Sequence, residues 1–105
     1  MSDIEKSSGN VYDDIGVENP QEMLVKAELA LTIRNILKSK GLTQLEASKI
    51  IDLPQPKLSR LLNGQFRGIS EAKMLECLIK LGRDVQIVIG EAKAQEGQLS
   101  VMVVA

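Results

Sequence analysis

The chain has 105 residues, of which 44% are hydrophobic and 2% aromatic, and its net charge is −1. A chain of this length forms one small domain with tails, and a core so poor in aromatic residues must be aliphatic, which favours packed helices. The absence of histidine and the single Cys77 leave no usual general base and no cysteine pair, so we predict no enzyme, no metal and no cofactor.

Residues 1–18 are rich in Ser, Asp, Gly and Asn, and we predict an acidic, flexible leader. Its first ten residues are too polar for a signal peptide, and no apolar run in the chain approaches the roughly 20 residues that cross a bilayer. With one cysteine as well, we expect a cytoplasmic protein without membrane contact. The leader also holds scattered apolar residues that form a candidate recognition segment for a partner: Val11, Tyr12, Ile15 and Val17.

The first predicted helix runs from Pro20 to Lys40. Asn19 is a favourable N-cap, Pro20 suits the first helical position, and Gly41 suits the left-handed position after the helix. Apolar residues recur at helical spacing and predict a buried stripe. The stripe comprises Met23, Ala27, Ala30, Ile33 and Leu37, widened by Leu24, Leu31 and Ile36.

Two short helices are predicted next. Thr43 and Glu46 have the spacing of a capping box, which opens a helix that reaches about Ile51. Residues 52–54 interrupt the helical pattern, and a third helix covers residues 55–62 and ends before Asn63 and Gly64.

A fourth helix follows, capped by Ser70 and reaching Leu81 before Gly82. Its predicted inward residues are Leu75, Leu78 and Ile79.

The hydrophobic period then changes from that of a helix to that of a strand. Residues 84–89 and 99–104 are rich in β-branched side chains, and the polar residues 90–98 connect them, which predicts a β-hairpin. An isolated hairpin is only marginally stable and its edges invite pairing. We therefore expect these strands to pair with a second subunit, with coverage of the helical core of one monomer as the alternative.

The second and third helices have the features of a helix-turn-helix. Ala47 and Ser48 are small where two helices would approach, and Asp52 tolerates a left-handed turn. The expected inner anchors are Leu45, Ile51, Leu58, Leu61 and Leu62.

The residues left facing outward are mostly hydrogen-bond donors, which suits DNA. The N-terminal part of a helix in the major groove contacts base edges, where Gln suits adenine and Arg or Lys suits guanine. We predict base readout by Gln55, Lys57, Ser59 and Arg60. Residues at the helix ends and in the following loop suit phosphate oxygens, and these are Gln44, Asn63 and Arg67.

Charge is distributed in a way that fits this prediction. Residues 26–83 carry eleven Lys and Arg against five acids, a net charge of +6, whereas residues 1–25 carry −5 and residues 84–105 carry −2. A basic segment suits a polyanion, although a solvated helical surface has the same composition.

The stretch LTQLEASKIIDLPQPKLSRLLNG resembles the helix-turn-helix of the Xre and phage-repressor type. Together with GNVYDDIG at residues 9–16 and LGRDVQIVIG at residues 81–90, it resembles the Xre-family antitoxins of HigA-like toxin–antitoxin modules. The resemblance implies a mainly α domain of four to five helices with C-terminal strands used in dimerisation. It also implies a homodimer that binds operator DNA, represses its own operon and neutralises a small basic RelE/HigB-like ribonuclease.

The predicted organisation is therefore a leader at 1–18, a DNA-binding domain at 19–83 and a strand element at 84–105. Two alternatives remain: an Xre-type regulator without a toxin, and a protein-interaction module in which the helix-turn-helix is only a scaffold. Pro54 and Pro56 bracket Gln55 and remove two backbone donors that phosphate could have used.

Overall fold

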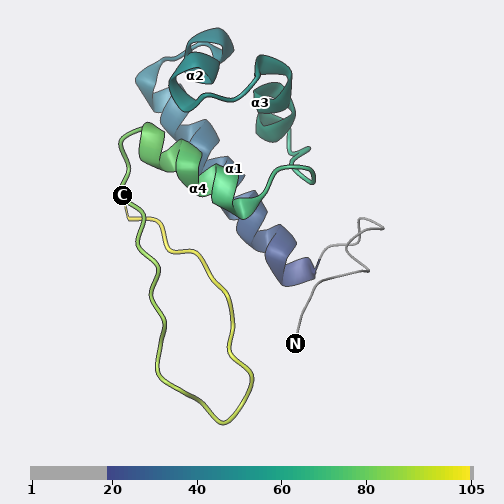
Figure 1. The fold of residues 1–105 in the computed structure, drawn as a ribbon, viewed down its shortest axis with the longest axis vertical. Coiled ribbons are helices and arrows are strands. Elements are labelled where there is room, and N and C mark those ends of the chain that lie inside the picture. Colours follow the sequence, from purple (N-terminus) through teal and green to yellow (C-terminus); the bar gives the residue numbers. More distant parts are fainter. Residues whose placement is uncertain (1–18, 105) are drawn as a thin grey trace.

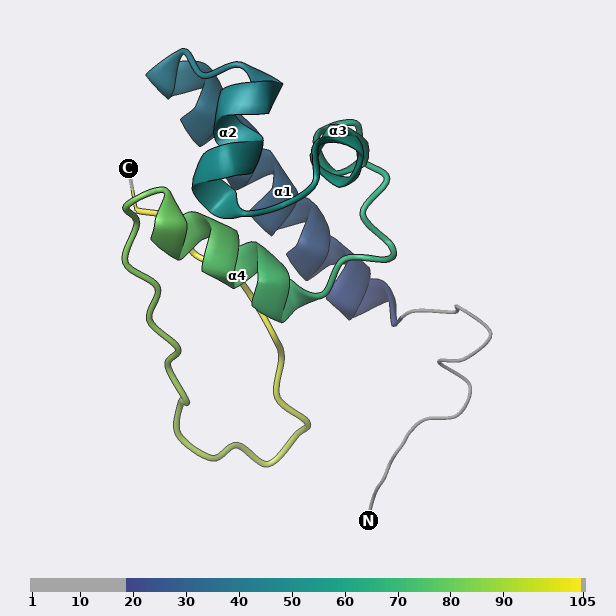
Figure 2. The same cartoon turned by 45° about the horizontal axis from the view of Figure 1, so that its top comes forward.

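The computed structural model describes residues 19–104, and these residues form an all-α body with an extended C-terminal segment (Figure 1). Its helices are α1 (Pro20–Lys40), α2 (Gln44–Ile51), α3 (Gln55–Leu62) and α4 (Glu71–Lys80). The long α1 packs against α4 and α3, while α2 contacts α3 and α4 (Figure 2). None of these helices has the length and hydropathy that a membrane span requires. The predicted leader, including its candidate recognition segment, lies outside the described residues.

The helix ends confirm the predicted caps of the first two helices. Asn19 Oδ1 accepts a hydrogen bond from the Gln21 backbone N–H at 2.7 Å, and Gly41 ends α1 with φ 68°. At α2, Thr43 Oγ1 accepts from the Glu46 N–H at 3.1 Å, and Glu46 Oε1 accepts from the Thr43 N–H at 2.9 Å. The hydrogen bond from the Thr43 backbone N–H is the main cause of a lowered pKa of the Glu46 carboxyl. The Thr43 hydroxyl lowers this pKa further, because both bonds favour the charged form.

The bounds of the last two helices also agree with the sequence pattern. Helix α3 covers residues 55–62 as predicted, and α4 ends at Lys80 with Leu81 as its C-cap, one residue earlier than expected. Ser70 Oγ caps α4 by accepting from the Lys73 N–H at 3.1 Å. The helical part of the chain is thus specified by local signals.

The buried face of α1 differs from the predicted stripe. Its buried side chains are Val25, Lys26, Leu29, Ala30, Ile33, Ile36 and Leu37. Ala27 and Leu31 are exposed, and Leu24 is 71% exposed. The predicted burial is confirmed for four residues of the stripe: Ala30, Ile33, Ile36 and Leu37. The covered face is rotated away from the others, because α1 is apolar on more than one face and its partners α3 and α4 select which face is covered.

Two further inward assignments are wrong. Leu45 of α2 is 53% exposed and Ile79 of α4 is 58% exposed, whereas Ala47 and Leu78 are buried beside them. Each of these two helices has only about two to three turns, so a single covered face accommodates few of its apolar residues.

The predicted C-terminal β-hairpin is also wrong for this chain on its own. Residues 83–104 are extended, but no strand occurs within the described residues, and no backbone ladder joins the arm 84–89 to the arm 99–104. The physical reason is that β-branched residues favour an extended backbone, whereas a strand also needs a partner strand for its N–H and C=O groups. The two arms form an open loop that projects from the helices (Figure 1).

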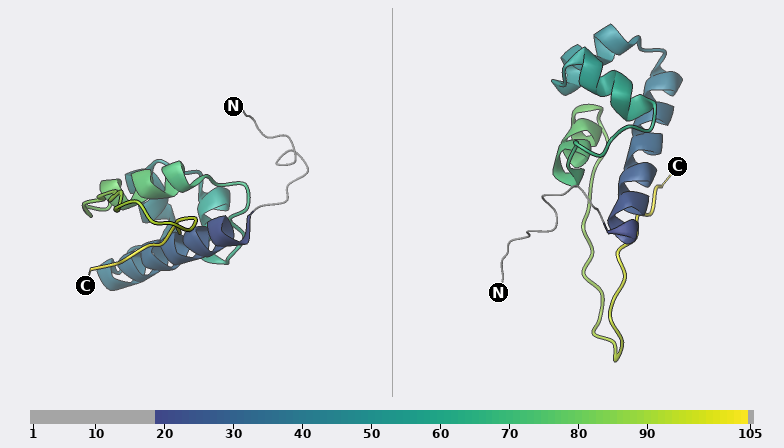
Figure 3. Two further views of the ribbon diagram at one scale, coloured as in Figure 1. Left: turned by 90° about the horizontal axis from the view of Figure 1, so that it is seen from below. Right: turned by 90° about the vertical axis from the view of Figure 1, so that its right-hand side faces the viewer.

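The returning arm runs alongside α1 (Figure 3). The Leu99 carbonyl accepts from Gln21 Nε2 at 3.1 Å, and the Val104 carbonyl accepts from Arg83 Nη2 at 3.1 Å. Val101 packs partly buried against the core. The arm is therefore attached to α1 at Leu99 and to the core at Val101, while the bond at Val104 joins it to the start of the outgoing segment.

We predict that Leu58→Ala costs about 2–5 kcal/mol of unfolding free energy, because the fully buried Leu58 side chain would leave a cavity between α3 and the rest of the core. Leu45→Ala, the same change at the exposed site on α2, should cost less than about 1 kcal/mol. Urea unfolding followed by circular dichroism measures both values. Equal losses for the two variants would contradict the burial pattern.

Candidate nucleic-acid interface

The turn between α2 and α3 is fixed by backbone geometry and by α4. Asp52 is the C-cap of α2 with φ 55°, the only described residue other than glycine with a positive φ. Its carbonyl accepts from Lys73 Nζ at 3.3 Å, and its carboxylate lies 3.9 Å from Lys80 Nζ. Leu53 follows and is buried in the core. Local conformation and contacts from α4 together determine how α3 leaves α2.

Burial of Leu58 and Leu61 determines which face of α3 points outward. With 3.6 residues per turn, the opposite face holds Pro56, Arg60 and Asn63, which are four and three residues apart and all exposed. The residues predicted to contact DNA therefore divide between the centre of this outward face and its two sides.

The structure places the predicted base-reading residues on and around the outward face. Arg60 is exposed on this face, Gln55 is the exposed first residue of α3, and Ser59 is half-buried on one side. Lys57 lies on the other side. The four residues thus share one helix but do not share one stripe.

The predicted phosphate contacts are more widely spread. Gln44 is exposed at the first position of α2, and Asn63 is the C-cap of α3. Arg67 lies in the loop from α3 to α4, where its carbonyl accepts from Nζ of Lys26, a buried residue of α1. Gln44 and Asn63 therefore lie at the ends of the two motif helices, whereas Arg67 lies on a loop that is tied to α1.

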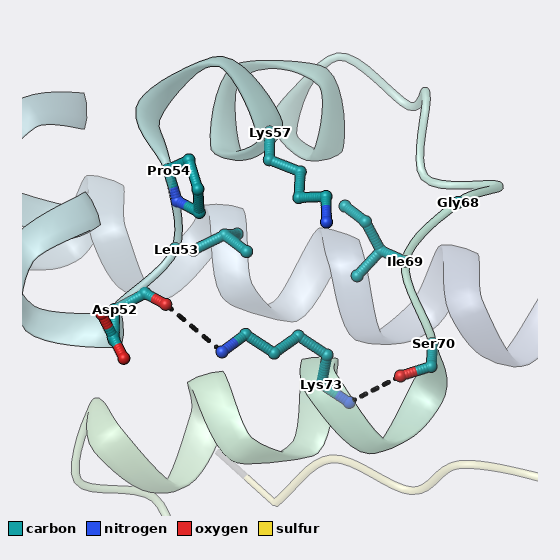
Figure 4. Close-up of a pocket in the computed structure, with 8 residues that line it drawn as sticks. All are labelled: Asp52, Leu53, Pro54, Lys57, Gly68, Ile69, Ser70 and Lys73. Carbon is teal, nitrogen blue, oxygen red and sulfur yellow. Dashed lines mark hydrogen bonds between the residues drawn. The ribbon is translucent and has the colours of Figure 1, made fainter.

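Lys57 reaches into an open pocket of about 400 Å³ between α3, the loop and the start of α4 (Figure 4). Lys73 reaches into the same pocket from α4, and Leu53 and Ile69 form its apolar part. Asp52 also lines this pocket and Lys73 is paired with Glu76, so the positive charge that α3 itself contributes on this side is the Lys57 ammonium. Anions approaching α3 from this side would be attracted.

Glu76 of α4 is paired with two lysines of its own helix. Glu76 accepts from Lys80 Nζ at 3.1 Å and lies 3.6 Å from Lys73 Nζ. The hydrogen bond from Lys80, followed by the charge of Lys73, lowers the pKa of the Glu76 carboxyl, so it remains ionised at neutral pH. Helix α3 itself contains no acidic residue, so nothing on it repels a phosphate backbone.

Sequence reasoning missed two residues of this surface. Pro56 lies at the centre of the outward face of α3, and the spacing from Leu58 and Leu61 could have revealed it. Lys73 lines the same pocket as Lys57 only because α4 folds back beside the turn, and no local signal indicates that arrangement. Within residues 19–104, no group of three metal-ligating side chains gathers.

Comparisons with known proteins agree with this arrangement. A family model described as "Helix-turn-helix domain" matches residues 11–90. A solved structure named "Putative XRE Family Transcriptional Regulator" superposes with a TM-score of 0.70 at 29% sequence identity, covering 81% of this chain and 96% of that chain. No curated protein matches the chain.

Proposed function

The chain belongs to the helix-turn-helix domain family, as an XRE-type DNA-binding transcription regulator, and we propose that it represses transcription by docking α3 in the major groove of an operator. The observation that carries the proposal is the exposed face of α3. It presents polar and cationic side chains, contains no acid, and is held rigidly by the buried Leu58 and Leu61. Such a helix meets the requirements for groove binding.

The proposed contacts follow from side-chain chemistry and position. Base edges are read by Gln55, Lys57, Ser59 and Arg60, since amides suit adenine and cations suit guanine. The DNA phosphates are contacted by Gln44, Asn63 and Arg67, which lie around the recognition helix α3. Arg60 is the strongest candidate, because it is exposed on the outward face and its guanidinium makes a bidentate contact possible.

We further propose that the regulator is a homodimer formed through the C-terminal arms. These arms expose large apolar side chains, including Ile87, Val88, Ile89, Met102 and Val104. Their backbone groups lack a ladder partner within the described chain, so a second copy would supply the missing strand. A two-fold dimer would present two α3 helices to a palindromic operator, about 34 Å apart.

The proposed biological role is that of an antitoxin that represses its own operon and neutralises a small basic RelE/HigB-like ribonuclease. The support is the resemblance of residues 9–90 to HigA-like antitoxins and the charge of residues 1–25, which is −5. Opposite net charges accelerate association and favour the correct partner. A regulator without a toxin would share the same DNA surface, so the partner must be tested directly.

For DNA binding, we predict that Arg60→Ala weakens affinity by about 5- to 150-fold for each half-site, because one base contact is lost in each subunit. The probe is a duplex selected from a random library by the wild-type protein, and fluorescence anisotropy at fixed salt measures binding. Lys93→Ala, which removes the same charge from the connector between the arms, should leave affinity unchanged. Wild-type affinity should also fall steeply with salt, because phosphate contacts release counterions. If the selection enriches no sequence, the proposed repression through sequence-specific DNA binding is rejected.

For assembly, we expect the wild-type protein to sediment as a dimer and Ile89→Lys to sediment as a monomer. Ile89 is 88% exposed, so the charge would leave the monomer fold intact but would disfavour strand pairing. Gln98→Lys introduces the same charge in the exposed connector and should remain dimeric. Analytical ultracentrifugation measures these states, and a monomeric wild-type protein at about 100 µM would exclude this dimer.

For the antitoxin role, we expect co-expression of the chain to restore growth to cells expressing the small ribonuclease-like open reading frame beside its gene. A variant lacking residues 1–18 should still bind the selected duplex but should lose this protection, because it lacks the acidic leader. Growth curves and anisotropy report the two properties separately. Full protection by the shortened variant would show that the leader is not part of the proposed toxin contact. No protection by the full chain would favour a regulator without a toxin.

A further inference from the structure

An apolar side chain lies at the centre of the otherwise polar outward face of α3. Pro56 is exposed, belongs to no part of the buried core, and lies in line with Arg60 and Asn63. It occupies the second position of α3, near the helix end that enters a groove first. Any partner of this face therefore meets the Pro56 ring between Gln55 and Arg60.

The fold itself makes little use of the ring. Pro54 already occupies the N-cap with φ −54°, and its carbonyl accepts from the Leu58 N–H at 2.9 Å, which closes the first turn. An N–H at the second helical position has no acceptor within the helix, so proline is tolerated there without loss. The exposed ring carbons of Pro56 are thus free to contact a ligand.

The chemistry of the major groove limits what such a ring can recognise. Pro56 has neither a side-chain polar group nor a backbone N–H, so it donates no hydrogen bond to a base or a phosphate. The apolar group that the major groove presents is the C5 methyl of thymine. The neighbouring Gln55 carries an amide that suits adenine, so the start of α3 has the chemistry to read A·T pairs.

We propose that Pro56 is a specificity-determining residue whose ring contacts the C5 methyl group of one thymine in each half-site. This inference rests on the proposed DNA-binding function and adds a residue and a base to it. Burying one methyl group in that contact strengthens binding by about fourfold relative to a site without the methyl. The contact distinguishes thymine from cytosine, which lacks the methyl.

The test removes that methyl and nothing else. Each thymine of the duplex selected by the wild-type protein is replaced singly by deoxyuridine, which keeps base pairing, and affinity is measured by anisotropy at fixed salt with full-length protein. For the wild-type protein, one deoxyuridine position in each half-site should weaken binding by about fourfold. Pro56→Ala removes the contact from both subunits, so it should bind the unmodified duplex about 16-fold more weakly, fourfold for each half-site, and should be insensitive to deoxyuridine at that position.

Two further variants separate base contact from a role in starting the helix. Pro56→Val keeps apolar carbons on the outward face and should restore the sensitivity to deoxyuridine. Arg60→Ala should bind more weakly overall but should keep the same sensitivity, because it leaves Pro56 in place. Circular dichroism confirms that each variant is folded.

The outcomes distinguish this inference from the proposed function. If Pro56→Ala keeps the wild-type response to every deoxyuridine, or if no deoxyuridine weakens the wild-type protein, the methyl contact is overturned while DNA binding stands. If the selection enriches no sequence, the proposed function fails and the methyl contact fails with it.

Discussion

The burial of Leu58 and Leu61 in the aliphatic core is the constraint on which the functional surface depends. A helix of eight residues has few side chains, so fixing two of them against the core fixes the direction of all the others. The core partners come from α1, α2 and α4, so the whole helical body contributes to the orientation of α3. The outward face of α3 is therefore a consequence of packing as much as of sequence.

Helix α4 contributes to the motif although it lies outside it. Lys73 and Lys80 contact Asp52 at the left-handed turn, while Glu76 engages both lysines. Exposed ion pairs of this kind contribute little energy individually. Their effect here is geometric, because they join the turn to α4.

The C-terminal arms show that a local preference for extended backbone does not by itself produce a β-sheet. Their β-branched residues produce an extended backbone. The returning arm is held beside α1 through Gln21, and Arg83 at the start of the outgoing segment donates to the Val104 carbonyl. No ladder forms between the arms in the described part of the chain, so the preference for extended backbone remains without a partner strand. The apolar residues exposed on the arms are what makes a second copy the proposed partner.

The sequence by itself determined the four helices and their ends, because caps such as Asn19, the Thr43–Glu46 box and Ser70 act within a few residues. It also determined the left-handed turn at Asp52 and most of the candidate DNA-contacting residues. Only the tertiary structure decided which face of α1 is buried, that Leu45 and Ile79 are exposed, and that the arms form no hairpin. It also placed Pro56 at the centre of the outward face and Lys73 in the same pocket as Lys57. These features depend on contacts between segments far apart in the chain, and no local pattern of residues encodes such contacts.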